Sequence, residues 1–169
     1  MRYMLLACLL FVVGCTGVPK GIAPVASFDL TRYLGTRYEI YRLDHSYERG
    51  MQGVTATYSR NEDGSVKVLN TGIEAGQTDA RASEGKALFV QEETTGHLKV
   101  SFFPFVYGSY VIFELGEDYS YAMVTSHNRD SLWLLARTPD ITPELDQHFL
   151  TTVAAFGFDM DELIRVEHY

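Results

Sequence analysis

Asp44, His45 and Ser46 are the types of residue that form a nucleophile, a base and an orienting acid in hydrolases. Here they are adjacent, and neighbouring side chains in an extended or turning segment point in divergent directions. The triplet therefore favours a structured loop with local hydrogen bonds, which would include Glu48 and Arg49. We expect no enzyme activity from these residues. An esterase that uses them remains the alternative.

The other four histidines are scattered along the chain: His97, His127, His148 and His168. No two of them have the paired spacing that a zinc site requires. The sequence also has no glycine-rich phosphate loop and no nucleophile elbow. We therefore expect no metal and no cofactor.

Cys15 is the residue with the most specific surroundings. Arg2 is followed by an apolar stretch from residue 3 to residue 13, which is too short to span a bilayer, and Gly14 precedes the cysteine. This arrangement predicts a lipoprotein signal peptide over residues 1–14, with cleavage before Cys15 and lipidation of that residue. Thr16, in place of an aspartate, indicates the outer membrane. A plain signal peptide with an incidental cysteine is the alternative.

Composition limits the remaining possibilities. The chain has 169 residues and a net charge of −8, and no run of Lys or Arg carries interleaved aromatic residues, so we expect no nucleic-acid partner. Its two cysteines, Cys8 and Cys15, lie in or directly after the signal, so no disulfide is expected in the rest of the chain. We expect residues 15–27 to be the lipidated cysteine and a tether, and residues 28–169 to be one domain.

From Phe28 onward the pattern is of short strands separated by turn residues, such as Asp63-Gly64. Only the connection from Asp44 to Gly53 is long, and it could cover one end of the fold. The expected strands are Arg37–Arg42, Val54–Arg60, Ser65–Gly72, Gly85–Gln91, His97–Phe103, Tyr107–Leu115, Ser120–Ser126 and Leu132–Arg137.

One helix follows these strands. Thr142 suits the N-cap, Pro143 the first helical position, and Gly157 the end of the helix. A single apolar stripe is formed by Leu145, Phe149, Val153 and Phe156. A short strand near Leu163–Val166 completes the chain. The fold class is therefore all-β: an eight-stranded antiparallel up-and-down β-barrel with one C-terminal helix packed outside and a short final strand, an architecture that holds ligands.

Residues 28–50, FDLTRYLGTRYEIYRLDHSYERG, closely resemble the opening of the bacterial lipocalins, relatives of apolipoprotein D and of plant temperature-induced lipocalins. Further matches follow in order, among them Glu84-Gly85-Lys86-Ala87, the run LKVSFF at 98–103 and the run LWLLARTP at 132–139. The resemblance covers the region after the signal almost end to end.

The chain departs from the family at one position near the closed end of the barrel. The family pattern there is Gly-x-Trp, whereas this chain has Gly35-Thr36-Arg37. The resemblance implies that Arg137, from the last barrel strand, packs across the family tryptophan. With Arg37 the partner is a second cation, so we expect a looser closed end and reduced stability, with the fold retained.

The resemblance implies a lipid ligand, a fatty acid or a lysophospholipid, held in an apolar cavity for transport, storage or scavenging. It also implies attachment to the membrane through the N-terminal anchor, with the domain facing the periplasm. Whether two barrels pair as a homodimer stays open. The alternatives are a structural envelope lipoprotein with a filled barrel and, ranked last, a pigment or haem binder. Alternation and the family pattern predict these inward-facing, ligand-binding residues: Tyr41, Tyr58, Val68, Asn70, Val100, Phe102, Val111, Phe113, Val124 and Trp133. Tyr41 stands where relatives usually have alanine, which predicts a narrower pocket.

Overall fold

The computed structural model describes residues 15–169. The predicted signal peptide, residues 1–14, lies outside the described residues. Among the described residues, no helix is both long enough and apolar enough to cross a membrane.

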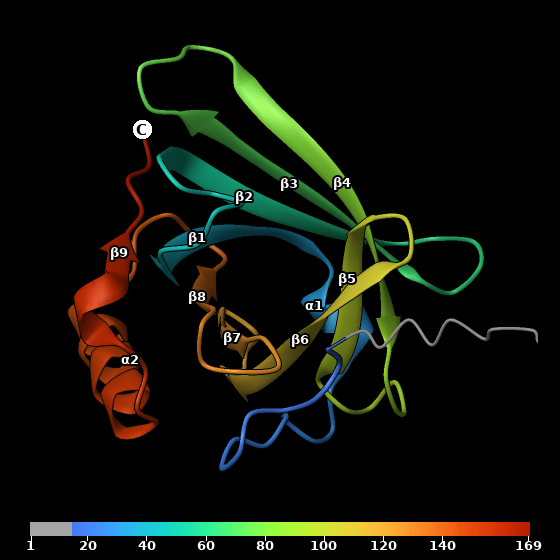
Figure 1. Cartoon of the computed structure of the whole chain (residues 1–169). Coiled ribbons are helices and arrows are strands. Elements are labelled where there is room, and N and C mark those ends of the chain that lie inside the picture. The colour runs from blue at the N-terminus through green and yellow to red at the C-terminus, as the bar shows by residue number, and fades with distance from the viewer. Residues whose placement is uncertain (1–14) are drawn as a thin grey trace, which may run out of the picture.

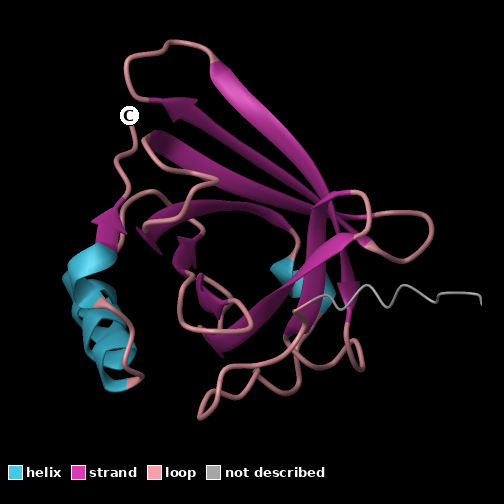
Figure 2. Ribbon diagram, in the orientation of Figure 1, coloured by secondary structure: helices cyan, strands magenta, loops and turns pink. Residues whose placement is uncertain are grey.

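Eight antiparallel strands form a closed barrel, because β1 pairs with β2 on one side and with β8 on the other (Figures 1 and 2). The short β9 adds to β1 outside this ring. This confirms the predicted fold class. The strand bounds are β1 Gly35–Leu43, β2 Met51–Arg60, β3 Val66–Glu74, β4 Ala80–Phe89, β5 His97–Phe103, β6 Val106–Leu115, β7 Tyr121–Thr125, β8 Leu132–Ala136 and β9 Leu163–Arg165.

The β3–β4 hairpin is longer than predicted. β4 begins at Ala80, not at Gly85, and its first five residues are all exposed. Their side chains show no apolar alternation, so the sequence carries no strand signal there. Backbone pairing from Ile73↔Ala80 onward defines the strand instead. In Figure 2 this part of the hairpin projects beyond the other strands, and no helix of the described residues packs against it.

The helix α2, Pro143–Ala155, packs on the outside of the barrel, as predicted (Figure 1). The Thr142 side chain accepts a hydrogen bond from the Leu145 amide, which caps the first turn. Phe149 and Val153 are fully buried against the outer faces of β1, β6, β7 and β8. The helix therefore covers an apolar part of the outer barrel wall.

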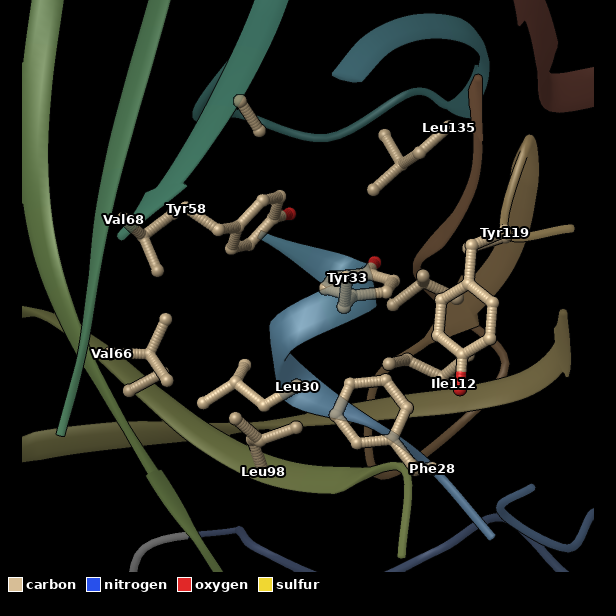
Figure 3. Packing of buried hydrophobic residues seen from close by; sticks show 14 residues of the cluster. Phe28, Leu30, Tyr33, Tyr58, Val66, Val68, Leu98, Ile112, Tyr119 and Leu135 are labelled. Carbon is tan, nitrogen blue, oxygen red and sulfur yellow. The ribbon is translucent and has the colours of Figure 1, made fainter. Parts of the chain in front are cut away.

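A short helix that the sequence did not predict closes one end of the barrel. α1, Leu30–Tyr33, begins at Asp29, whose carboxylate accepts from the Thr31 amide. Leu30 and Tyr33 enter the interior and pack with Phe28 beneath the strands (Figure 3). We refer to this end as the closed end, and to the end that carries the β1–β2 loop, residues 44–50, as the mouth.

Residues 15–27, predicted to be a tether, lie against the barrel. The Cys15 carbonyl accepts from the Ser109 amide at 3.1 Å, and Val25 exchanges backbone hydrogen bonds with Gly96 and Ile112. Ile22 is buried in the outer cluster, the set of outward-facing apolar residues that includes Val111 of β6 and Phe149 of α2. The segment therefore runs along β5 and β6, from Cys15 beside Gly108 towards α1.

Candidate ligand-binding cavity

The barrel encloses a cavity of about 90 Å³ whose wall is mainly apolar. Every barrel strand except β7 contributes to the wall, and α1 forms its floor. The lining residues are Phe28, Leu30, Tyr33, Glu39, Glu48, Val54, Ala56, Tyr58, Val66, Val68, Asn70, Ala87, Leu98, Val100, Phe102, Tyr110, Trp133 and Leu135.

Of the ten residues predicted to face a ligand, six line this cavity: Tyr58, Val68, Asn70, Val100, Phe102 and Trp133. A seventh, Val124, belongs to the interior cluster but fills space beside the cavity. Strand alternation predicts the inward orientation of these seven side chains correctly. Their contact with a ligand stays a prediction.

Tyr41, Val111 and Phe113 face outward, so the inward orientation predicted for them is wrong. Tyr41 stacks on Phe149 of α2 with ring centroids 5.0 Å apart, Val111 lies in the same outer cluster, and Phe113 packs on Phe156 at 5.6 Å. The register of β1 shifts after Glu39 and that of β6 shifts after Ile112. The bulge in β1 explains the orientation of Tyr41. The shift in β6 comes after Val111, and Tyr110 and Ile112 face inward while Val111 and Phe113 face outward, so for β6 the prediction took the wrong face of a regular strand. With Tyr41 outside, its side chain does not narrow the cavity as predicted.

The sequence did not predict that two carboxyl groups, Glu39 and Glu48, would enter the cavity wall at the mouth. Glu48 comes from the β1–β2 loop, and its Oε2 accepts from the Trp133 indole at 3.2 Å and lies 3.1 Å from His45 Nε2. Glu39 is almost fully buried, and its Oε1 accepts from the Arg42 guanidinium at 2.8 Å. Glu48 therefore joins the loop to the barrel interior.

The two carboxyl groups have opposite pKa shifts. Burial, and next the neighbouring Glu48 charge, raise the pKa of Glu39 well above its usual range, outweighing the Arg42 guanidinium. Burial also acts to raise the pKa of Glu48, but hydrogen bonding to His45 and Trp133 lowers it overall. Two adjacent buried carboxyls cannot both ionise readily. Glu39 consequently keeps the proton and donates to the Glu48 carboxylate.

At the closed end, Arg37 is fully buried, and its guanidinium carbon lies 4.0 Å from the centroid of the Tyr33 ring. None of its three side-chain nitrogens has a hydrogen-bond partner among the described residues. Arg137 lies across this end and donates to the carbonyls of Arg32, Tyr33 and Thr36. Burial and the Arg37 charge lower the pKa of Arg137. Arg37 and Arg137 thus lie close together, as the resemblance implied, and the guanidinium of Arg37 stacks on the Tyr33 ring.

Three tyrosine hydroxyls meet beside Arg37. Tyr110 Oη lies 2.7 Å from Tyr33 Oη and 2.8 Å from Tyr58 Oη, and all three residues line the cavity. Figure 3 shows the hydroxyls of Tyr33 and Tyr58 entering the same region of the interior. Burial raises the pKa of each tyrosine, so each hydroxyl keeps its proton.

The Asp44-His45-Ser46 triplet does not form a catalytic constellation. Asp44 accepts from Arg49 at 2.9 Å, His45 is directed at Glu48, and Ser46 is exposed. Over residues 15–169 no group of three or more His, Cys, Asp or Glu side chains could hold a metal ion. The described part of the chain thus presents the cavity as its one strong candidate site.

Comparison with known proteins assigns the family. Residues 28–168 match the lipocalin-like domain model. The chain is 46% identical to the outer membrane lipoprotein Blc of Vibrio cholerae, covering 96% of each chain, and 44% identical to the Blc lipoprotein of Escherichia coli, covering 92% of this chain and 89% of that one. Mouse apolipoprotein D is 32% identical over 83% of this chain and 77% of its own length. Insecticyanin from the tobacco hornworm has the same fold, with a TM-score of 0.69 at 16% identity, covering 90% of this chain and 87% of its own. With its closed barrel, outer helix and plugged floor, the chain belongs to the lipocalin family.

Proposed function

We propose that this protein binds a single-chain lipid, a fatty acid or a lysophospholipid, in the barrel cavity, for transport, storage or scavenging in the cell envelope. The observation that carries the proposal is the cavity itself: an apolar hollow, closed below by α1, with a few polar groups at its two ends. Ligand sites for small molecules have this composition.

The size of the cavity favours one slender chain. Ligand pockets usually measure about 300–1,000 Å³, whereas this one has about 90 Å³. Binding must therefore widen the cavity, and the β1–β2 loop is the element placed to move. Its Glu48 contacts with Trp133 and His45 are polar and can be exchanged for water when the loop opens. A filled barrel without ligand is the competing function.

We place the protein at the outer membrane, anchored by lipid on Cys15 and facing the periplasm. The names of the Blc relatives and the lipoprotein pattern before Cys15 support this placement. Cys15 lies beside Gly108, close to the β5–β6 hairpin tip, where Phe103 and Phe105 are 66% and 80% exposed. An anchored cysteine at this position would bring the apolar tip near the membrane surface.

Trp133 provides the direct test, because it is the only tryptophan and it lines the cavity. Val18 is the first residue packed in either core cluster, so residues 16–169 contain the whole core. Titration of this fragment with lysophospholipid, and separately with palmitic acid, should change Trp133 emission saturably at one ligand per barrel, below the micelle-forming concentration.

Two alanine variants make the titration specific. Ala56→Leu places a larger side chain in the cavity wall and should weaken binding at least fivefold, while Ala154→Leu on the exposed face of α2 should not. A flat response of the unmodified fragment to both lipids, with emission already blue-shifted, would favour the filled structural barrel.

A further inference from the structure

The closed end of the cavity has an excess of hydrogen-bond donors. The three tyrosine hydroxyls carry three protons, but only two contacts join them. In a chain of hydroxyls each contact uses one proton, so one O–H is left without a protein acceptor in this cluster. Because the cluster lines the cavity, that proton is available to a ligand.

Arg37 adds a positive charge without an acceptor. A guanidinium has five N–H donors, and over residues 15–169 none of the Arg37 nitrogens has a partner. Its contact with the Tyr33 ring places it one aromatic layer from the cavity. The nearby Arg137 brings a second positive charge, and its bonds are to neutral carbonyls. Buried charges are ordinarily paired, so this end of the barrel lacks an anion.

The mouth is less positive than the closed end, because the buried guanidinium there, that of Arg42, is accompanied by two carboxyl groups and already donates to Glu39 and to the Met51 carbonyl. Glu48 is ionised at neutral pH and Glu39 shares its proton with it. Asn70 Oδ1, also in the cavity wall, is a buried acceptor without a partner in the described structure. A carboxylate held at the mouth would face Glu48, which repels it, whereas at the closed end it would face donors and two guanidinium groups.

We propose that the cavity takes a free long-chain carboxylic acid head first, with its carboxylate at the tyrosine hydroxyls beside Arg37 and its chain running towards the mouth. This inference rests on the proposed lipid-binding function and narrows the ligand to one class. A lysophospholipid would have to bring its glycerophosphate head through the narrow cavity to reach the same donors. Its larger head group therefore does not fit the closed end.

The first experiment measures the orientation of the ligand. Stearic acids that carry a nitroxide at carbon 5 or at carbon 16 quench tryptophan emission over short distances. The Trp133 indole donates a hydrogen bond to Glu48 near the mouth. An acid bound head first therefore places its carbon 16 nearer to Trp133 than its carbon 5. We expect the carbon-16 label to quench at least twice as strongly as the carbon-5 label. Stronger quenching by the carbon-5 label would overturn the proposal.

The second experiment measures the role of the charge. Palmitic acid should bind the 16–169 fragment at least tenfold more tightly than its methyl ester, which has the same chain without the charge. Arg37→Met should reduce this preference to less than threefold while the ester binds as before. The control Arg32→Met removes an exposed arginine from the same end and should keep the preference. Tyr110→Phe, which removes the central hydroxyl, provides a second variant that keeps the ring.

The outcomes separate the inference from the function on which it rests. If the acid, the ester and lysophospholipid all fail to bind, the lipid-binding function itself fails. If only lysophospholipid binds, lipid binding stands and the carboxylic acid is the wrong ligand class. If both bind equally, lipid binding stands and the head-first carboxylate is wrong. If they bind equally and chloride also raises the melting temperature of the parent fragment but not of Arg37→Met, the donors hold an inorganic anion only, which likewise overturns the proposal.

Discussion

Replacing Arg37 with tryptophan should make the empty barrel more stable. The Arg37 side chain is 0% exposed and its nitrogens have no hydrogen-bond partner among the described residues. An uncompensated buried charge costs about 3–5 kcal/mol, and stacking on Tyr33 offsets about 0.5–2 kcal/mol of that cost. The variant should therefore gain about 2 kcal/mol in the free energy of unfolding. For a domain of this length that corresponds to roughly 4–8 °C in Tm.

Thermal unfolding of the 16–169 fragment, followed by circular dichroism without added lipid, measures this gain. Arg37→Met belongs in the same series because it removes the charge without the bulk of an indole. Arg81→Met is the matched control, since it removes an arginine that is 70% exposed and should shift Tm by less than 2 °C, as surface changes do (about ±0.5 kcal/mol). If neither Arg37 variant melts above the parent, the unpaired charge is not a cost to this fold and the reasoning fails.

Three further predictions concern the wall and the outer face of the barrel. Because the pKa of Glu39 is raised in the folded state, its contribution to stability is present at acidic pH and is lost as pH rises through the folded-state pKa. Glu39→Gln should therefore gain stability relative to the parent as pH rises above the ordinary pKa of a glutamate, as urea unfolding at several pH values would show. Gly85→Ala should cost about 1–3 kcal/mol, because a Cβ there would lie 2.8 Å from the Phe102 ring, whereas Gly108→Ala, with nothing within 4 Å, should cost far less; equal losses in urea midpoint would contradict this. Phe149→Ala should cost about 3–5 kcal/mol, since the ring is fully buried between α2 and the barrel, and a loss below 1 kcal/mol would mean that the helix contributes little to stability.

Much of this fold follows from local signals in the sequence. Seven of the eight predicted barrel strands overlap the observed ones closely, and β4 is the exception because its exposed half has no apolar alternation. The helix after β8 was predicted from Thr142, Pro143 and its apolar stripe, and it begins at Pro143. These features depend on neighbouring residues, so no knowledge of distant contacts is needed to find them.

The candidate site was predicted only in part. Alternation identified cavity residues such as Tyr58, Val68 and Trp133, because a side chain two positions along a regular strand returns to the same face. It failed for Tyr41 and Val111. One bulge after Glu39 puts Tyr41 on the outer face. In β6 the family pattern predicted that Val111 faces inward, whereas Ile112 faces inward and Val111 faces outward.

By itself, the sequence determined the fold class, the strand order in the chain, the outer helix and the unusual arginine at the closed end. Only the tertiary structure decided that Glu48 reaches from a loop into the cavity, and that Tyr33, Tyr58 and Tyr110 bring their hydroxyls together from α1, β2 and β6. These tyrosines are 25, 52 and 77 positions apart along the chain, and nothing in the sequence distinguishes them from tyrosines that only fill a core. Their chemistry arises when barrel closure brings distant strands to one point, and pairing of distant strands is not a local property of the sequence.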